Sequence, residues 1–148
     1  MDMKQQITED MKAAMRAGDT RRRDAIRLLL AAIKQREVDE RIALNDAAVI
    51  AVMEKMLKQR RDSIAQYEAA HRDDLADAEK YEMGVLQAYM PEALSDSEVE
   101  NAVAEAIFAA GARGQQDMGR VMAALKSRLS GRADMGKVST LVRVKLLS

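Results

Sequence analysis

Residues 89–98 read YMPEALSDSE, and this stretch divides the chain into two parts. It contains the only proline, Pro91, which cannot continue a helix and biases Met90 away from helical geometry. Shortly after it, the residues from Ser95 to Glu98 form a capping box: the Ser95 side chain can accept from the Glu98 amide while the Glu98 side chain reaches back. One helix is therefore expected to end before Pro91, and another to begin at Ser95.

On both sides of this boundary, apolar residues recur at the three- and four-residue spacing of amphipathic helices. Residues that favour strands do not cluster into alternating runs. The chain has 148 residues, of which 48% are apolar, with seven Gly and one Pro. This composition, rich in good helix formers, predicts an all-α fold.

Seven helices are expected, with four in an N-terminal helical domain (residues 1–90) and three in a small C-terminal domain (residues 94–148). The first four are predicted at about 3–17, 20–38, 45–70 and 72–89. The last three are predicted at about 95–111, 117–129 and 136–147. Glycines 18, 111 and 131 are expected to end helices, because glycine readily adopts the left-handed conformation of a helix C-terminus.

Charge is distributed unevenly, although the whole chain has 24 basic and 24 acidic residues. Residues 1–61 hold fourteen basic and ten acidic groups, residues 62–110 hold two and twelve, and residues 111–148 hold eight and two. A positive end segment is typical of proteins that bind the phosphates of nucleic acids. The candidate RNA-binding residues are Arg113, Arg120, Lys126, Arg128, Arg132 and Lys137. The alternative is that these charges serve solubility, and that Arg143 and Lys145 complement the dipole of the last helix.

Residues suited to catalysis or metal binding are few. The chain has no cysteine and a single histidine, His71. The acidic cluster at Asp73, Asp74, Asp77, Glu79 and Glu82 is interpreted as a solvated helix face, because no calcium-type loop or nucleophile accompanies it. We therefore predict no catalytic residue, no cofactor-binding residue and no metal ligand, and no enzymatic activity of the chain by itself.

Two further patterns have alternative interpretations. The segment from Gly111 to Gly114, of sequence GARG, matches the glycine loop by which KH domains clamp RNA, but the sheet of that domain is missing, so a helix end and a flexible loop are favoured. The triplet Arg21-Arg22-Arg23 opposes the dipole of the second helix, and internal pairing is favoured over a bound phosphate. Tyr67 and Tyr89 are expected in the core, so any RNA should be recognised through phosphates and shape rather than stacked bases.

Several stretches together resemble the GatB/YqeY family, and specifically its stand-alone YqeY-like members. The resemblance covers nearly the whole chain and rests on residues 58–64, Tyr67, residues 72–76, residues 89–91 with Leu94 and Ser95, residues 117–122 and residues 131–138. Met135 stands between Asp134 and Gly136, where many relatives have Asp-Gly directly. The resemblance implies a helical bundle joined to a three-helix tail. In the amidotransferase subunit GatB the similar tail contacts tRNA and is attached to a catalytic cradle that this chain lacks.

The leading hypothesis is a non-catalytic helical module that binds RNA, with tRNA as the expected partner, through the C-terminal domain. One alternative is an adaptor that binds a protein partner and no nucleic acid. Another is an accessory to a tRNA-dependent amidotransferase, a carbon–nitrogen ligase with glutamine as amido donor. The polar N-terminus, the lack of cysteine and the longest uncharged run, Met83 to Pro91, predict a cytoplasmic protein without a membrane span.

Overall fold

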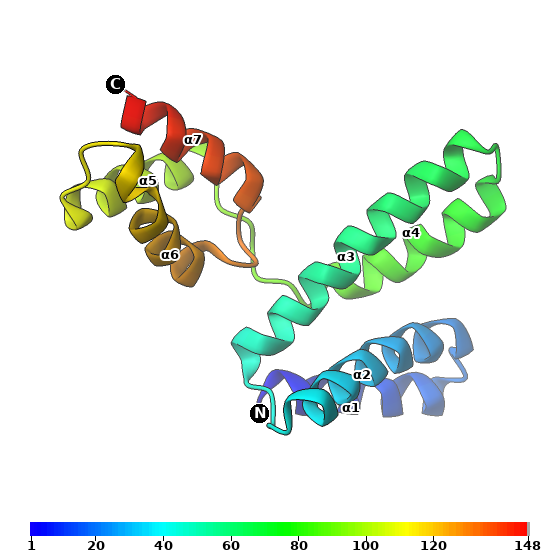
Figure 1. Ribbon diagram of the computed structural model, residues 1–148. Coiled ribbons are helices and arrows are strands. Elements are labelled where there is room, and N and C mark those ends of the chain that lie inside the picture. Colours follow the sequence, from blue (N-terminus) through cyan, green and yellow to red (C-terminus); the bar gives the residue numbers. More distant parts are fainter. Residues whose placement is uncertain (148) are drawn as a thin grey trace. The chain divides into compact units, whose positions relative to one another are not determined.

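The computed structural model describes residues 1–147, and every regular element in that range is helical (Figure 1). The prediction of an all-α fold is therefore confirmed. The elements are α1 (Met3–Ala17), α2 (Thr20–Glu40), α3 (Asp46–Ala69), α4 (Asp73–Gln87), α5 (Asp96–Ala110), the short 3₁₀ helix η1 (Gln115–Asp117), α6 (Met118–Leu129) and α7 (Met135–Leu147). The chain divides into two compact units, an N-terminal unit (Met1–Met90) and a C-terminal unit (Pro91–Ser148).

The N-terminal unit consists of two helical hairpins, α1 with α2 and α3 with α4, that share one hydrophobic core (Figure 1). Gly18 lies between α1 and α2 in the left-handed conformation that the sequence predicts, with φ of 71°. Each helix contributes an apolar stripe at helical spacing. The fully buried side chains of this core are Ile7, Ile26, Leu29, Val49 and Met53.

Two apolar residues near the end of α2 lie differently from the prediction. Val38 was expected in the core and is 58% exposed, because it follows Ile33 by five residues, about 140° around the helix. Glu37 occupies the partly buried position instead. Leu44, expected in a polar loop, is only 3% exposed and packs against the core beyond the end of α2.

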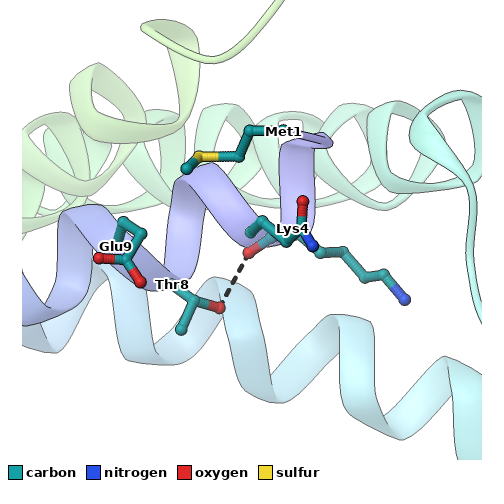
Figure 2. Close-up of a pocket in the computed structure, with 5 residues that line it drawn as sticks. Met1, Lys4, Thr8 and Glu9 are labelled. Atoms are coloured by element: carbon teal, nitrogen blue, oxygen red, sulfur yellow. Dashed lines mark hydrogen bonds between the residues drawn. The ribbon is translucent and has the colours of Figure 1, made fainter.

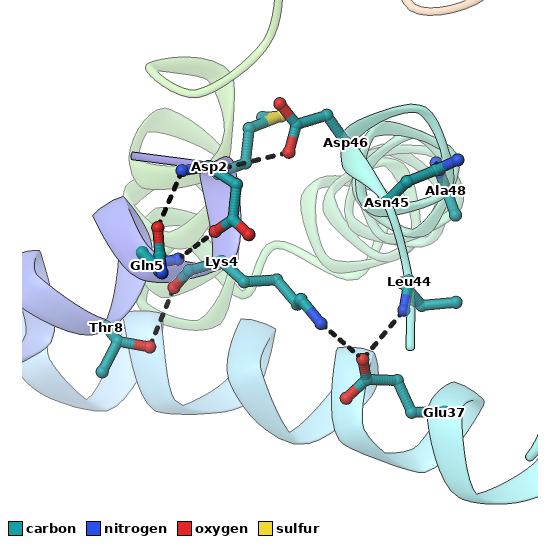
Figure 3. A network of polar contacts seen from close by, with 10 residues as sticks. Asp2, Lys4, Gln5, Thr8, Glu37, Leu44, Asn45, Asp46 and Ala48 are labelled. Carbon is teal, nitrogen blue, oxygen red and sulfur yellow. Dashed lines mark hydrogen bonds and ion pairs between the residues drawn. The ribbon is translucent and has the colours of Figure 1, made fainter. Parts of the chain in front are cut away.

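Glu37, near the end of α2, connects the start of α1 with the residues just before α3 (Figure 3). Its Oε2 accepts from Nζ of Lys4 on α1 at 2.7 Å and from the N–H of Leu44, just before α3, at 2.9 Å. The Met3 N–H also donates to Oδ1 of Asp46 at 3.0 Å, so the start of α1 is held against the start of α3. The hydrogen bond from Lys4, followed by that from Leu44, holds the pKa of Glu37 below its usual 4.5.

The substitution Glu37→Gln should make the N-terminal unit less stable at neutral pH and less sensitive to acid. Because the folded-state pKa of Glu37 is lowered, its stabilising contribution is present above pH 4.5 and is lost as the pH falls through the folded-state value. The gap in urea midpoint between wild type and variant should therefore shrink on acidification from about pH 7 to about pH 3. The control Glu40→Gln removes a more exposed pair with Arg36 and should have a smaller effect. A gap that stays constant with pH would show that the Glu37 carboxylate does not act in this way.

Two of the three arginines at the start of α2 have partners within the N-terminal unit, which agrees with the internal pairing favoured from the sequence. The Arg21 guanidinium lies over the ring of Tyr81, 4.0 Å from its centroid, and Arg23 pairs with Asp24 at 2.9 Å. Tyr89 packs against the core, and its hydroxyl donates to Asp10. Burial, together with this bond, raises the pKa of Tyr89. Arg21 and Arg23 are therefore accounted for without a bound phosphate.

The C-terminal unit packs α5, α6 and α7 around a second core (Figure 1). Its fully buried side chains are Val103, Val121, Leu125, Val138 and Val142. The predicted capping box starts α5: the Glu98 N–H donates to the Ser95 hydroxyl and the Ser95 N–H donates to Glu98 Oε1, both at 3.2 Å. Across residues 1–147, none of the helices is both long enough and apolar enough to pass through a membrane.

Candidate nucleic-acid interface

The charges of the C-terminal unit are separated by helix. The helix α5 carries four acidic side chains and no basic one, whereas α6 and α7 together carry six basic side chains and no acidic one. Across the whole unit, eight basic residues face seven acidic ones. The C-terminal unit is therefore nearly neutral as a whole, although residues 111–148 alone are strongly positive. Its acidic side chains are concentrated on α5 and its basic side chains on α6 and α7.

Two of the six predicted RNA-binding residues have carboxylate partners. Arg120 donates from Nη2 to Asp117 at 2.6 Å and from Nη1 to the Ala110 carbonyl at 3.2 Å. Arg128 donates to Glu105 of α5 at 2.8 Å. Both guanidinium groups are exposed, but the Asp117 carboxylate is only 16% exposed, so a phosphate can compete more readily for Arg128 than for Arg120.

Arg128 and Arg132 are brought together, because they line the same hollow. The other lining residues include Leu94, Glu98 and Asn101. Arg132 Nε donates to the Glu92 carbonyl at 3.2 Å, and its own carbonyl accepts from the Leu94 N–H at 2.8 Å. This hollow therefore combines two guanidinium groups with a carboxylate, which makes it polar but not uniformly positive.

Arg113 lies in a different hollow, together with Lys145. Both side chains are exposed, and neither forms an ion pair with any residue in the described part of the chain. Ile107, Phe108, Gly111 and Ala112 also line this hollow. Phe108 is 89% exposed, so the only phenylalanine of the chain stands in solvent beside two cations.

The exposure of Phe108 was missed in the sequence analysis, although the spacing contains the signal. Phe108 follows the buried Val99 by nine residues, which places it on the opposite side of α5, about 180° away. Ala102 and Val103, which are also buried in the core, lie on the same side of α5 as Val99. A large apolar residue at that position must face solvent or a partner.

Lys126 and Lys137 are exposed, and neither forms an ion pair with the residues that the structure describes. Lys126 precedes Arg128 by two positions, and residues at that spacing do not share a helix face. Since Arg128 reaches α5, Lys126 points elsewhere. The six candidates thus do not form one compact group: Arg128 and Arg132 share a hollow, Arg113 lies in another, Arg120 is paired with Asp117, and the two lysines are exposed on α6 and α7.

The loop from Gly111 to Gly114 does not resemble a free phosphate-binding loop. Gly111 ends α5 in the left-handed conformation, with φ of 61°. The N–H groups of Gly111 and Ala112 donate to carbonyls of α5, and the Arg113 N–H donates to Asp117 at 2.9 Å. These three amides are therefore engaged within the protein, and residues 1–147 include no strand of a KH domain.

Asp117 and Gln115 hold this loop in place. The hydrogen bond from the Arg113 N–H and the one from Arg120 lower the pKa of Asp117. Gln115 Nε2 donates to the Arg143 carbonyl of α7 at 3.1 Å. The loop is thus bound to η1 through Asp117, and η1 is bound to α7 through Gln115, which fixes the backbone from which the Arg113 side chain extends.

Another hollow lies beside the start of α1 in the N-terminal unit (Figure 2). The Thr8 hydroxyl donates to the Lys4 carbonyl at 2.8 Å, while Lys4 Nζ is bound by Glu37. Gln5 belongs to the capping box of α1. The polar groups that line this hollow are occupied in supporting the helix, so we assign no function to it.

His71 lies at the turn between α3 and α4, and the acidic stretch runs from this turn along α4, where Glu79 and Glu82 pair with Arg60 of α3. His71 has a left-handed backbone with φ of 58°, and Asp74 pairs with Arg72 at 3.1 Å. Within residues 1–147, no group of three or more His, Asp or Glu side chains is arranged to hold a metal ion.

Comparison with known proteins gives relatives that are named as mitochondrial. A protein of Eremothecium gossypii called "Altered inheritance of mitochondria protein 41, mitochondrial" is 41% identical over 85 residues, which is 57% of this chain and 46% of that protein. The proteins of the same name from Candida glabrata and a strain of Saccharomyces cerevisiae are each 35% identical, over 58% and 62% of this chain and 48% and 50% of their own lengths. The chain spans about half the length of the curated relatives it matches.

These names contradict the expected cytoplasmic location, and that prediction was wrong. It rested on a polar N-terminus, on the lack of cysteine and on the lack of a long apolar run. None of these three features argues against a mitochondrial location, because organelle-targeting segments are themselves amphipathic and polar.

The identity of the family follows from a match over nearly the full length. The family model described as "Yqey-like protein" matches residues 4–146, which include all seven α-helices except the outermost residues. The resemblance inferred from residues 58–64, 117–122 and 131–138 is thereby confirmed. The chain belongs to the Yqey-like protein family.

Proposed function

We propose that this protein is a non-catalytic module that binds RNA through its C-terminal unit, with tRNA as the first RNA to test. The observation that carries the proposal is the separation of charge, with six basic and no acidic side chains on α6 and α7. Lys126, Lys137, Arg143 and Lys145 are exposed and form no ion pair within residues 1–147. Such cations can neutralise phosphates without first breaking an internal bond.

The acidic helix α5 determines how the RNA would approach. Because the unit as a whole is nearly neutral, attraction depends on orientation, and the α6–α7 side would turn toward the nucleic acid. The pairs Arg120–Asp117 and Arg128–Glu105, together with the bond from Arg132 to the Glu92 carbonyl, leave five of the eight basic side chains without such a contact in residues 1–147. We therefore expect about five phosphate contacts and moderate affinity rather than tight binding.

Binding of labelled tRNA to the purified full chain, followed by fluorescence anisotropy at low salt, tests the proposal. Saturable binding is expected, with a similar affinity for different tRNAs, because contacts to phosphates carry no sequence information. Absence of binding at low salt would contradict the proposal.

The rival interpretation, an adaptor for a protein partner, is distinguished by capture from lysate with and without nuclease. Under the RNA proposal, material retained by the chain should be lost after nuclease treatment. Partners that survive digestion, and that bind the chain directly once purified, would favour the adaptor.

A further inference from the structure

The Phe108 side chain and its surroundings combine three features that occur together only here among the described residues of the C-terminal unit. The ring is 89% exposed, it borders a hollow, and the hollow is also lined by Arg113 and Lys145. A single exposed apolar side chain is ordinary and needs no explanation. An aromatic ring that shares a hollow with a guanidinium and an ammonium group, neither paired with a carboxylate in residues 1–147, is a more specific arrangement.

The chemistry of this hollow suits a ligand that has a flat apolar ring, which can stack on Phe108, and negatively charged groups beside that ring, which can bind the two cations. An aromatic ring stacks on a nucleobase of any identity, because every base has a π-face. Arginine and lysine side chains nearby neutralise the phosphates on either side of that base. Bases in a duplex are already stacked on one another, so only an unpaired nucleotide can present its face to Phe108.

The backbone that carries the Arg113 side chain is held in place, which favours a built site over a chance arrangement. The Arg113 N–H is bound by Asp117 of η1, and Gln115 of η1 is bound to α7, where Lys145 lies. Phe108 and Arg113 are thus held on either side of the Gly111 turn, with Lys145 approaching from a third element.

We propose that the hollow at Phe108, Arg113 and Lys145 binds one unpaired nucleotide of the RNA, with its base on the Phe108 ring and its phosphates at the two cations. This inference rests on the proposed function and narrows it: the preferred RNA contains a single-stranded end, loop or bulge. It also revises the expectation from the sequence that stacking plays no part.

The test compares Phe108→Ala with wild type, using the full chain and a labelled single-stranded oligonucleotide of about a dozen nucleotides. Loss of stacking should weaken binding by about 5- to 100-fold. Phe108→Trp should bind within about threefold of wild type, since it keeps a stacking surface. Leu147→Ala is the matched control, because Leu147 is another exposed apolar side chain, 71% exposed, that does not line the hollow.

Two further probes separate the possible outcomes. An oligonucleotide with abasic sugars should bind wild type and Phe108→Ala equally, since no base is available to stack. A perfectly paired RNA duplex should show the same insensitivity to the substitution.

Equal binding of the single strand by wild type and Phe108→Ala would overturn this inference and leave the proposed function in place. Failure of the wild-type chain to bind any RNA would contradict the proposed function itself. An acidic peptide that contains tryptophan and displaces the oligonucleotide at equal concentration would assign the hollow to a protein partner, and would also overturn the inference.

Discussion

Leu125→Ala is expected to unfold the C-terminal unit while the N-terminal unit stays folded. Leu125 is fully buried at the centre of the C-terminal core, and replacing a buried leucine by alanine costs about 2–5 kcal/mol. Three short helices with a small core have a stability of only a few kcal/mol, so the substitution removes most or all of it. The N-terminal unit has a separate core around Ile26 and Met53 and should not be affected.

Amide NMR spectra of the full chain can measure this outcome unit by unit. Signals of α5, α6 and α7 should collapse to unfolded positions, whereas those of α1 to α4 should keep their dispersion. The control Leu147→Ala should change the stability by no more than about 0.5 kcal/mol, because that side chain is exposed. Loss of both sets of signals together would show that the two units depend on one another for stability.

The second large effect is expected from removing four unpaired cations of the C-terminal unit. The combined substitution of Arg113, Lys126, Lys137 and Lys145 by glutamine should weaken tRNA binding by about 100- to 1,000-fold at low salt. Glutamine keeps the length and polarity of these exposed side chains, so the fold should persist and can be verified by circular dichroism.

A matched control removes the same charge from the other unit. Arg16, Arg27, Lys55 and Lys58 are exposed on the N-terminal unit and form no ion pair within the described chain. Their combined substitution by glutamine should change the affinity by no more than about threefold, through the loss of distant charge alone. Equal losses for the two quadruple variants would indicate a response to net charge and not a surface on the C-terminal unit.

Much of the fold was predictable because local signals and tertiary packing agree. The Ser95 capping box, the break at Pro91 and the glycine ends at Gly18 and Gly111 all appear where local chemistry places them. The buried residues of α6, Val121, Leu125 and Leu129, are four positions apart, so only one face of the helix can be turned toward the core. The errors occurred near the end of α2. Val38 no longer faces the core, because the apolar face of α2 rotates away from it along the helix. Leu44 is buried because the chain turns back after α2, and no local sequence pattern predicts that turn.

The site was less predictable, because its charges are set by partners that are distant in sequence. Arg128 and Glu105 are 23 residues apart, and only the packing of α6 on α5 makes them a pair. Counting charges from Gly111 onward placed the acidic α5 outside the basic segment, although both belong to one unit. By contrast, the exposure of Phe108 was predictable from the sequence, because Phe108 follows Val99 by nine residues. An exposed aromatic side chain beside basic residues suggests a stacking role.

The salt dependence of tRNA binding by the full chain tests the central claim most directly. If about five phosphates are neutralised, log Kd plotted against log salt concentration should give a slope of magnitude about 3.5 to 4.5, with affinity falling as salt rises. A slope near zero, or no binding at the lowest salt, would contradict an RNA-binding surface formed by the cations of the C-terminal unit.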